Sequence, residues 1–187
     1  MSLALTPEQQ FDAAFASAFE DRKELFRFLG GVTEEQARWK PPEGEWSVLE
    51  GLEHVLLTDA FFQSAMLEAL KEAGASGRWD NSVPGAFKMT LEALRRREQG
   101  HVDAPPPLHP KGRTGLRAMT GELMPGREAV REALLAWRGR DLSRLVVPSP
   151  RYGALNAYER IIYSGIHDAL HQEQMERVTR QPGFPGR

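Results

Sequence analysis

The sequence predicts an all-α protein, an up-down four-helix bundle with a long irregular connection between the second and third helices. Two observations support this prediction. Several helix-start signals are each followed by apolar residues at helical spacing, and almost no stretch shows the alternation typical of strands. The chain has 187 residues, of which 41% are hydrophobic, enough for one core. We therefore expect residues 1–187 to form a single domain.

The first helix is predicted from a capping box. Thr6 can cap a helix whose first position is Pro7, and Gln9 can bond back to the backbone of the cap. Apolar residues then recur on one side of the helix until Gly30, which is suited to a helix end. This pattern predicts a helix that faces the core.

The second long helix follows a short helical turn. Residues 33–36 (Thr-Glu-Glu-Gln) form a capping box that predicts the turn. Ser47 with Glu50 forms another box, which predicts a helix from Ser47 to about Glu72. At 100° per residue, His54 lies beside the aliphatic stripe of this helix and points toward the interior or its edge.

The middle of the chain gives the weakest signals. Between residues 74 and 110 only residues 86–99 resemble a helix, and the prolines at 105–107 exclude one there. A third helix is predicted from about Pro125 to Arg138, with a separate helical piece over residues 116–123. Residues 145–147 form an apolar run too short to assign. His101 and His109 are expected on the surface of this segment.

The fourth helix is predicted from the cap Asn156, with Glu159 three residues on, to about Arg180. Residues 161–167 carry no charged side chain, so this part is expected to be enclosed. One polar face of the helix consists of five residues: Arg160, Ser164, His167, His171 and Gln174.

Composition excludes several functional classes. The net charge of −2 gives no overall basic field for nucleic acid or an anionic membrane. The chain has no cysteine, so any metal must be held by nitrogen and oxygen. No leader pattern and no apolar stretch of about 20 residues is present, which predicts a soluble cytoplasmic protein.

Three histidines form the candidate metal site. His167 and His171 are four residues apart and leave the same helix face, and His54 comes from the inner side of another helix. Imidazole nitrogens suit zinc or nickel, and three of them leave a coordination position open for water or substrate. The alternative interpretation is that these are ordinary core or surface histidines, because such a pair on a helix is a weak signal.

The two histidine motifs resemble those of the DinB-like (damage-inducible) family of four-helix bundles. The matching residues are Trp46, Ser47, Glu50 and His54, then residues 153–158 (Gly-Ala-Leu-Asn-Ala-Tyr) leading into His167, His171 and Gln174. The resemblance implies a divalent metal bound by His54, His167 and His171. Better understood members transfer low-molecular-weight thiols such as bacillithiol or mycothiol, or are thiol-dependent isomerases, while many have no assigned activity.

We therefore expect a metal-dependent thiol transferase or hydrolase with an open three-histidine site, a small-molecule substrate, and a homodimer. The alternatives are a non-catalytic metal-stabilised bundle acting in binding or stress response, and a bundle with empty histidines that acts through protein partners. No catalytic residue is assigned.

Other polar residues near the histidine motifs are weaker candidates. Gln174 could orient a ligand, or form a hydrogen bond between helices. Asp59 is better placed to pair with another helix, and Glu53 and Asp168 lie off the ligand face. The basic residues over 109–117 could receive the carboxylate of a thiol cofactor, although a solvated loop is the preferred interpretation.

Overall fold

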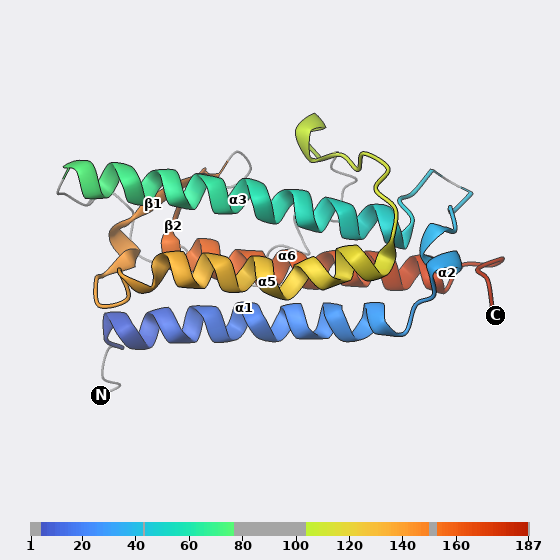
Figure 1. The fold of residues 1–187 in the computed structure, drawn as a ribbon, viewed down its shortest axis with the longest axis horizontal. Helices are drawn as coiled ribbons and strands as arrows, with labels where there is room; N and C mark the ends of the chain where they lie inside the picture. The colour runs from blue at the N-terminus through green and yellow to red at the C-terminus, as the bar shows by residue number, and fades with distance from the viewer. Residues whose placement is uncertain (1–4, 43, 77–103, 150–152, 187) are drawn as a thin grey trace.

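The computed structural model describes residues 5–42, 44–76, 104–149 and 153–186. Four long helices lie side by side in these parts of the chain (Figure 1). They are α1 (Pro7–Gly30), α3 (Val48–Ser76), α5 (Leu116–Leu135) and α6 (Ala157–Thr179). The shorter elements are α2 (Glu34–Arg38), the 3-10 turns η1 (Pro106–Leu108) and η2 (Leu142–Arg144), and the strands β1 (Val146–Ser149) and β2 (Gly153–Asn156). The predicted all-α class is confirmed, and no described helix is long and apolar enough to cross a membrane.

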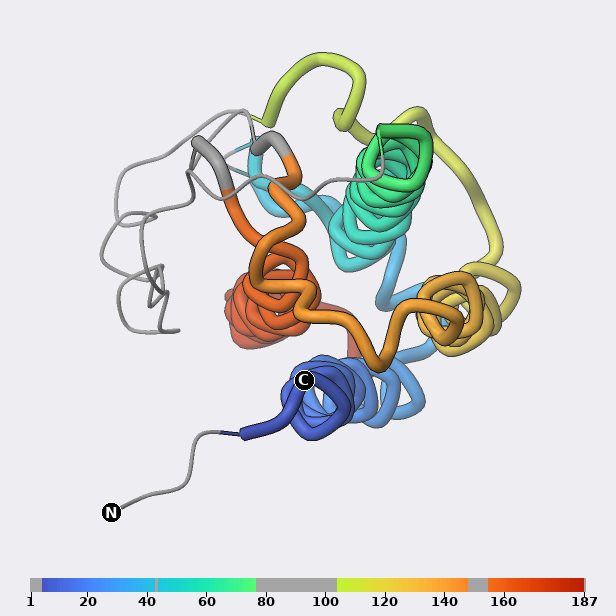
Figure 2. The backbone as a smooth tube through the Cα atoms, turned by 90° about the vertical axis from the view of Figure 1, so that its left-hand side faces the viewer, coloured from blue at the N-terminus to red at the C-terminus, as the bar shows by residue number. Residues whose placement is uncertain are grey.

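The helices do not alternate in direction along the chain. Viewed along their axes in Figure 2, α1 and α3 occupy opposite corners, and each packs against both α5 and α6. The colours in Figure 1 show that α1 and α6 run one way while α3 and α5 run the other. The simple up-down order expected from the sequence is therefore not confirmed. With 29 residues, α3 is about 44 Å long.

The core includes two large apolar clusters, one toward each end of the bundle, and a small third cluster on α6 formed by Tyr163, Ile166 and Leu170. Both large clusters include buried residues from all four long helices. One contains Phe11, Phe15, Met66, Leu70, Leu134 and Ile161. The other contains Leu25, Leu29, Val48, Leu52, Met119, Leu123, Met175 and Val178. Because early residues of α3 and α5 share one cluster and late residues share the other, the two helices must be parallel.

Each of the four long helices contributes one side chain to a buried charge network. Arg22 donates to Asp168 at 2.7 and 2.8 Å and to Asp59 at 2.6 Å. Arg127 donates to Asp168 at 3.0 Å and to Asp59 at 3.3 Å. Burial acts to lower the pKa of Arg22, but the two carboxylates outweigh it and raise that pKa. The prediction that Asp59 pairs with another helix is thus confirmed.

Gly165 allows α1 and α6 to approach closely. A methyl group at this position would lie 2.6 Å from Asp21 Oδ2 and 2.8 Å from the Cα atom of Ala18. Only glycine avoids that overlap without a shift of one helix. The close approach belongs to the part of α6 that carries His167 and Asp168.

The capping predictions are confirmed at four helix starts. The Thr6–Gln9, Thr33–Gln36 and Asn156–Glu159 boxes cap α1, α2 and α6, and Ser47 and Glu50 exchange both bonds before α3. Local chemistry therefore sets where these helices begin.

Two predictions in the second half of the chain are wrong. The third long helix begins at Leu116, with Pro125 inside it, instead of starting near Pro125. Both Pro125 and Gly121, whose carbonyl loses its partner, are exposed, so water can satisfy that oxygen. A helix was also excluded at the prolines 105–107, but Pro106–Leu108 forms the 3-10 turn η1, which needs only one turn of backbone. The run at 145–147, which was left unassigned, leads into a hairpin in which β1 pairs antiparallel with β2. Residues 86–99 and His101 lie outside the described residues.

Candidate metal centre

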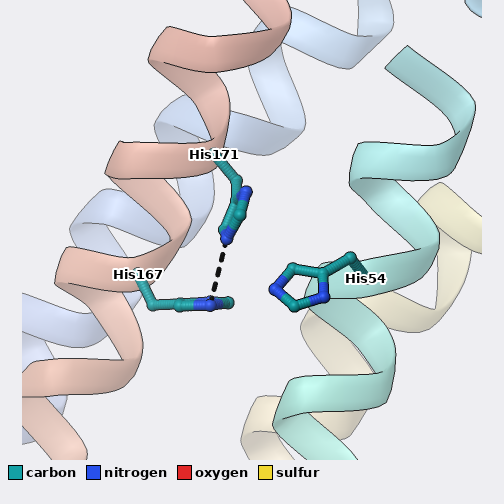
Figure 3. Close-up of side chains that lie close together, drawn as sticks. All are labelled: His54, His167 and His171. Carbon is teal, nitrogen blue, oxygen red and sulfur yellow. Dashed lines mark hydrogen bonds between the residues drawn. The ribbon is translucent and has the colours of Figure 1, made fainter. Parts of the chain in front are cut away.

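Three histidines from two helices meet in the interior of the bundle. His54 comes from α3, and His167 and His171 come from adjacent turns of α6 (Figure 3). One ring nitrogen from each lies within 4.8 Å of the others. The residues are only 5%, 8% and 9% exposed, respectively. The structure thus brings together the three residues that the sequence suggested as metal ligands.

A backbone carbonyl fixes the tautomer of His54. Its Nδ1 atom lies 2.8 Å from the carbonyl oxygen of Leu108 in η1. Because a carbonyl oxygen can only accept, Nδ1 must carry the proton, and Nε2 presents a lone pair. Figure 3 shows the ring of His54 directed toward His167 and His171. The arrangement is the usual one for a metal-binding histidine, whose other nitrogen donates to a carbonyl or carboxylate.

The spacing of the α6 pair also fits an ion. The Nε2 atoms of His167 and His171 are 3.1 Å apart. Two nitrogens bound to one tetrahedral zinc at the usual bond length would lie about 3.3 Å apart. The separation of the two nitrogens therefore matches that of two ligands of one ion, and the four-residue spacing on a helix accounts for it.

Burial keeps these imidazoles in the neutral form that binds metal. Burial lowers the pKa of His54, an effect that Leu108 opposes and His109 reinforces. For His167, burial and then the neighbouring His171 and His54 lower the pKa well below its ordinary value. Both rings are consequently neutral near pH 7 and offer lone pairs without first losing a proton.

Aromatic rings surround the histidines. The Trp46 ring lies 4.8 Å from that of His54 and is stacked on that of His171 at 6.5 Å. The rings of Phe62 and Tyr163 lie 6.1 and 5.8 Å from that of His167. These rings limit access of water, which strengthens electrostatic effects inside the site. Trp46 is part of the family motif in the sequence, but its contact with the histidines was not predicted.

Glu53 supports the segment that carries Leu108. One of its carboxylate oxygens accepts from the backbone N–H groups of Gly112 and Arg113, both at 3.0 Å. Gly112 has a φ of 82°, a conformation that glycine adopts without strain. Glu53 is therefore not a ligand, as expected, but it has a positioning role that the sequence analysis missed. The signal available in the sequence was a glutamate directly before the candidate ligand His54, within an apolar stretch of the helix.

The remaining candidates from the sequence are less closely involved. Gln174 is half-buried, and no hydrogen bond to it is found within the described ranges. His109 is exposed as predicted, with its Nε2 atom 2.6 Å from the carbonyl oxygen of Ala104. In the basic segment, the Arg113 guanidinium is already paired with Glu122, which leaves it little capacity for an anionic cofactor.

The fold and the histidine cluster together define a helical bundle with a buried interhelical site of metal-binding composition. The family model of the DinB superfamily matches residues 20–175, so the chain belongs to that superfamily. The chain is also similar to the uncharacterized protein YuaE of Bacillus subtilis (strain 168), with 28% identity over 164 residues, covering 87% of this chain and 94% of that protein. No solved structure matches the chain significantly.

Proposed function

We propose that the protein binds one divalent ion, zinc or nickel, through His54, His167 and His171. We further propose that it acts as a metal-dependent thiol transferase or hydrolase. The observation that best supports metal binding is the fixed tautomer of His54, whose lone pair is directed toward the close pair on α6. Three protein ligands leave one position of a tetrahedral ion for a substrate.

A bound ion of this type lowers the pKa of a coordinated thiol or water and so produces a nucleophile at neutral pH. The chain's own residues hold the ligands in place, through Leu108 and Glu53, and keep water away, through Trp46 and Phe62. Because the protein has no cysteine, the thiol in a transfer reaction comes from a small molecule such as bacillithiol or mycothiol.

Metal analysis of protein purified without a histidine tag tests the site. We expect about one zinc or nickel ion per chain, and His171→Ala should lose it. His109→Ala is a matched control, because this exposed histidine also lies near Trp46, with ring centres 6.3 Å apart. Wild-type protein that stays metal-free after reconstitution, or a His171→Ala variant with unchanged metal content, would show that the ligands are wrong.

Activity is tested separately on the metal-loaded protein. Thiol-transfer and hydrolysis substrates should be turned over by the wild type and by His109→Ala, but not by His54→Ala. A second candidate function is a non-catalytic metal-stabilised bundle that acts in binding or stress response. The strong burial of the three histidines favours it. Metal removal that lowers stability without any turnover in the screen would support this second function.

The homodimer expected from the sequence remains a prediction. Phe61 and Leu67 are exposed apolar residues on α3 that could contribute to such a contact. Light scattering at several concentrations tests it.

A further inference from the structure

A second candidate site lies in a cavity that none of the three histidines lines. The cavity has a volume of about 530 Å³ and is bordered by all four long helices. Most of its lining is apolar, including Leu56, Phe62, Met66, Val130 and Ile161. A volume of this size is typical of small-molecule sites, in which a few polar groups fix the orientation of the ligand.

Arg160 is the polar group that sets this cavity apart. It lines the cavity, is only 1% exposed, and none of its three guanidinium nitrogens has a hydrogen-bond partner among the described residues. The guanidinium carbon lies 3.7 Å from the centre of the Phe62 ring. Stacking on the ring face leaves the N–H groups at the edge of the guanidinium able to donate. Burial lowers the pKa of Arg160 to about 10.

The other charged side chains lining the cavity already have partners. Arg127 and Asp59 belong to the buried network, in which two arginines balance two aspartates. Arg113 is paired with Glu122. Within the described part of the lining, Arg160 therefore contributes one uncompensated positive charge. It also lies near the N-terminus of α6, where the helix dipole disfavours a cation.

We propose that this cavity binds an organic monocarboxylate with an apolar body, whose carboxylate pairs with Arg160. A monoanion balances the single excess charge, and the planar guanidinium matches a carboxylate with two parallel hydrogen bonds. The apolar lining accommodates the rest of the molecule. This assignment does not depend on the proposed metal site.

Calorimetric titration with octanoate, compared with octanamide, tests the charge requirement. The two probes have nearly the same shape, but only octanoate carries a carboxylate. Octanoate should bind the wild-type protein at least about 30-fold more tightly than octanamide. Arg160→Met should lose this preference, while Arg177→Met, the same change at an exposed arginine of the same helix, should retain it.

The same titration on His171→Ala distinguishes octanoate bound at Arg160 from octanoate bound to a metal ion at the three histidines. Octanoate binding that persists in His171→Ala supports the cavity, whether or not the protein proves to be a metalloenzyme. Equal affinity for octanoate and octanamide in the wild type, or unchanged octanoate binding in Arg160→Met, would overturn the proposal. The comparison of probes needs no variant, so a folding defect in Arg160→Met leaves a decisive measurement.

Discussion

The Nδ1 atom of His54 donates to the carbonyl oxygen of Leu108 at 2.8 Å. This bond connects a candidate ligand on α3 to a segment 54 positions later in the chain. It sets both the tautomer and the orientation of the ring before any ion is bound. The geometry of the candidate site therefore depends on residues other than the three histidines.

Glu53→Gln should weaken metal binding even though Glu53 is not a ligand. Its carboxylate holds the backbone of residues 112 and 113, close to Leu108, and a neutral amide is a weaker acceptor. We expect a loss of about 10-fold to 100-fold in metal affinity, measured by competition with a chromophoric chelator. Glu122→Gln, which alters only an exposed pair with Arg113, is the control. Equal affinity in both variants would contradict the positioning role.

Acidification should destabilise the metal-free protein in the range where histidines titrate. The pKa values of His54 and His167 are lowered on folding from 6.5, so the unfolded chain binds more protons than the native state. The contribution of these two histidines to stability is fully present above pH 6.5 and is lost as the pH falls below it, by up to about 1.4 kcal/mol per pH unit for each histidine. Urea unfolding at a series of pH values measures this slope. A double variant, His54→Gln with His167→Gln, should show a weaker dependence of stability on pH. An unchanged dependence would show that these two histidines do not cause it.

Gly165→Ala should destabilise the fold by about 1–3 kcal/mol, because the added methyl group overlaps the backbone of α1. Gly126→Ala is the matched control within α5, where an added methyl group meets nothing within 4 Å. That variant should gain about 0.5–1 kcal/mol from helix propensity. Denaturant unfolding compares the two, and a gain in both would show that α1 and α6 can separate freely.

Asp168→Asn should cost about 3–5 kcal/mol of stability, since it leaves two buried arginines with only Asp59 as a carboxylate partner. Asp12→Asn removes a carboxylate from an exposed pair with Arg138 and should have a much smaller effect. Thermal unfolding of both variants gives the comparison. Similar midpoints would mean that the buried network contributes little.

The features of the structure that depend on local chemistry could be predicted from the sequence. The boxes at Thr6, Thr33, Ser47 and Asn156 each combine an oxygen acceptor with a side chain three residues later, so the helix starts can be predicted without tertiary information. The histidine pair was equally visible, because helical spacing alone places both rings on one face.

The features that could not be predicted from the sequence depend on contacts between segments far apart in the chain. Pro125 normally signals a helix start, but its exposed position within α5 permits a continuous helix. The hairpin of β1 and β2 is too short to show a clear alternation. Leu108 acts on His54 through its backbone, so its residue type carries no information about that role.

Because α3 and α5 run in the same direction, the segment that precedes α5 lies next to His54. If α5 ran the other way, it would begin near Ser76, and a short turn could join the two helices at the end remote from the histidines. Because α5 begins beside the start of α3, the described residues just before it, 104–115, lie at that end and place Leu108 and Gly112 against His54 and Glu53. The candidate metal site thus depends on the order of the helices as well as on its three histidines. An insertion or deletion between Leu108 and Leu116 would alter the site without changing any of its three candidate ligands.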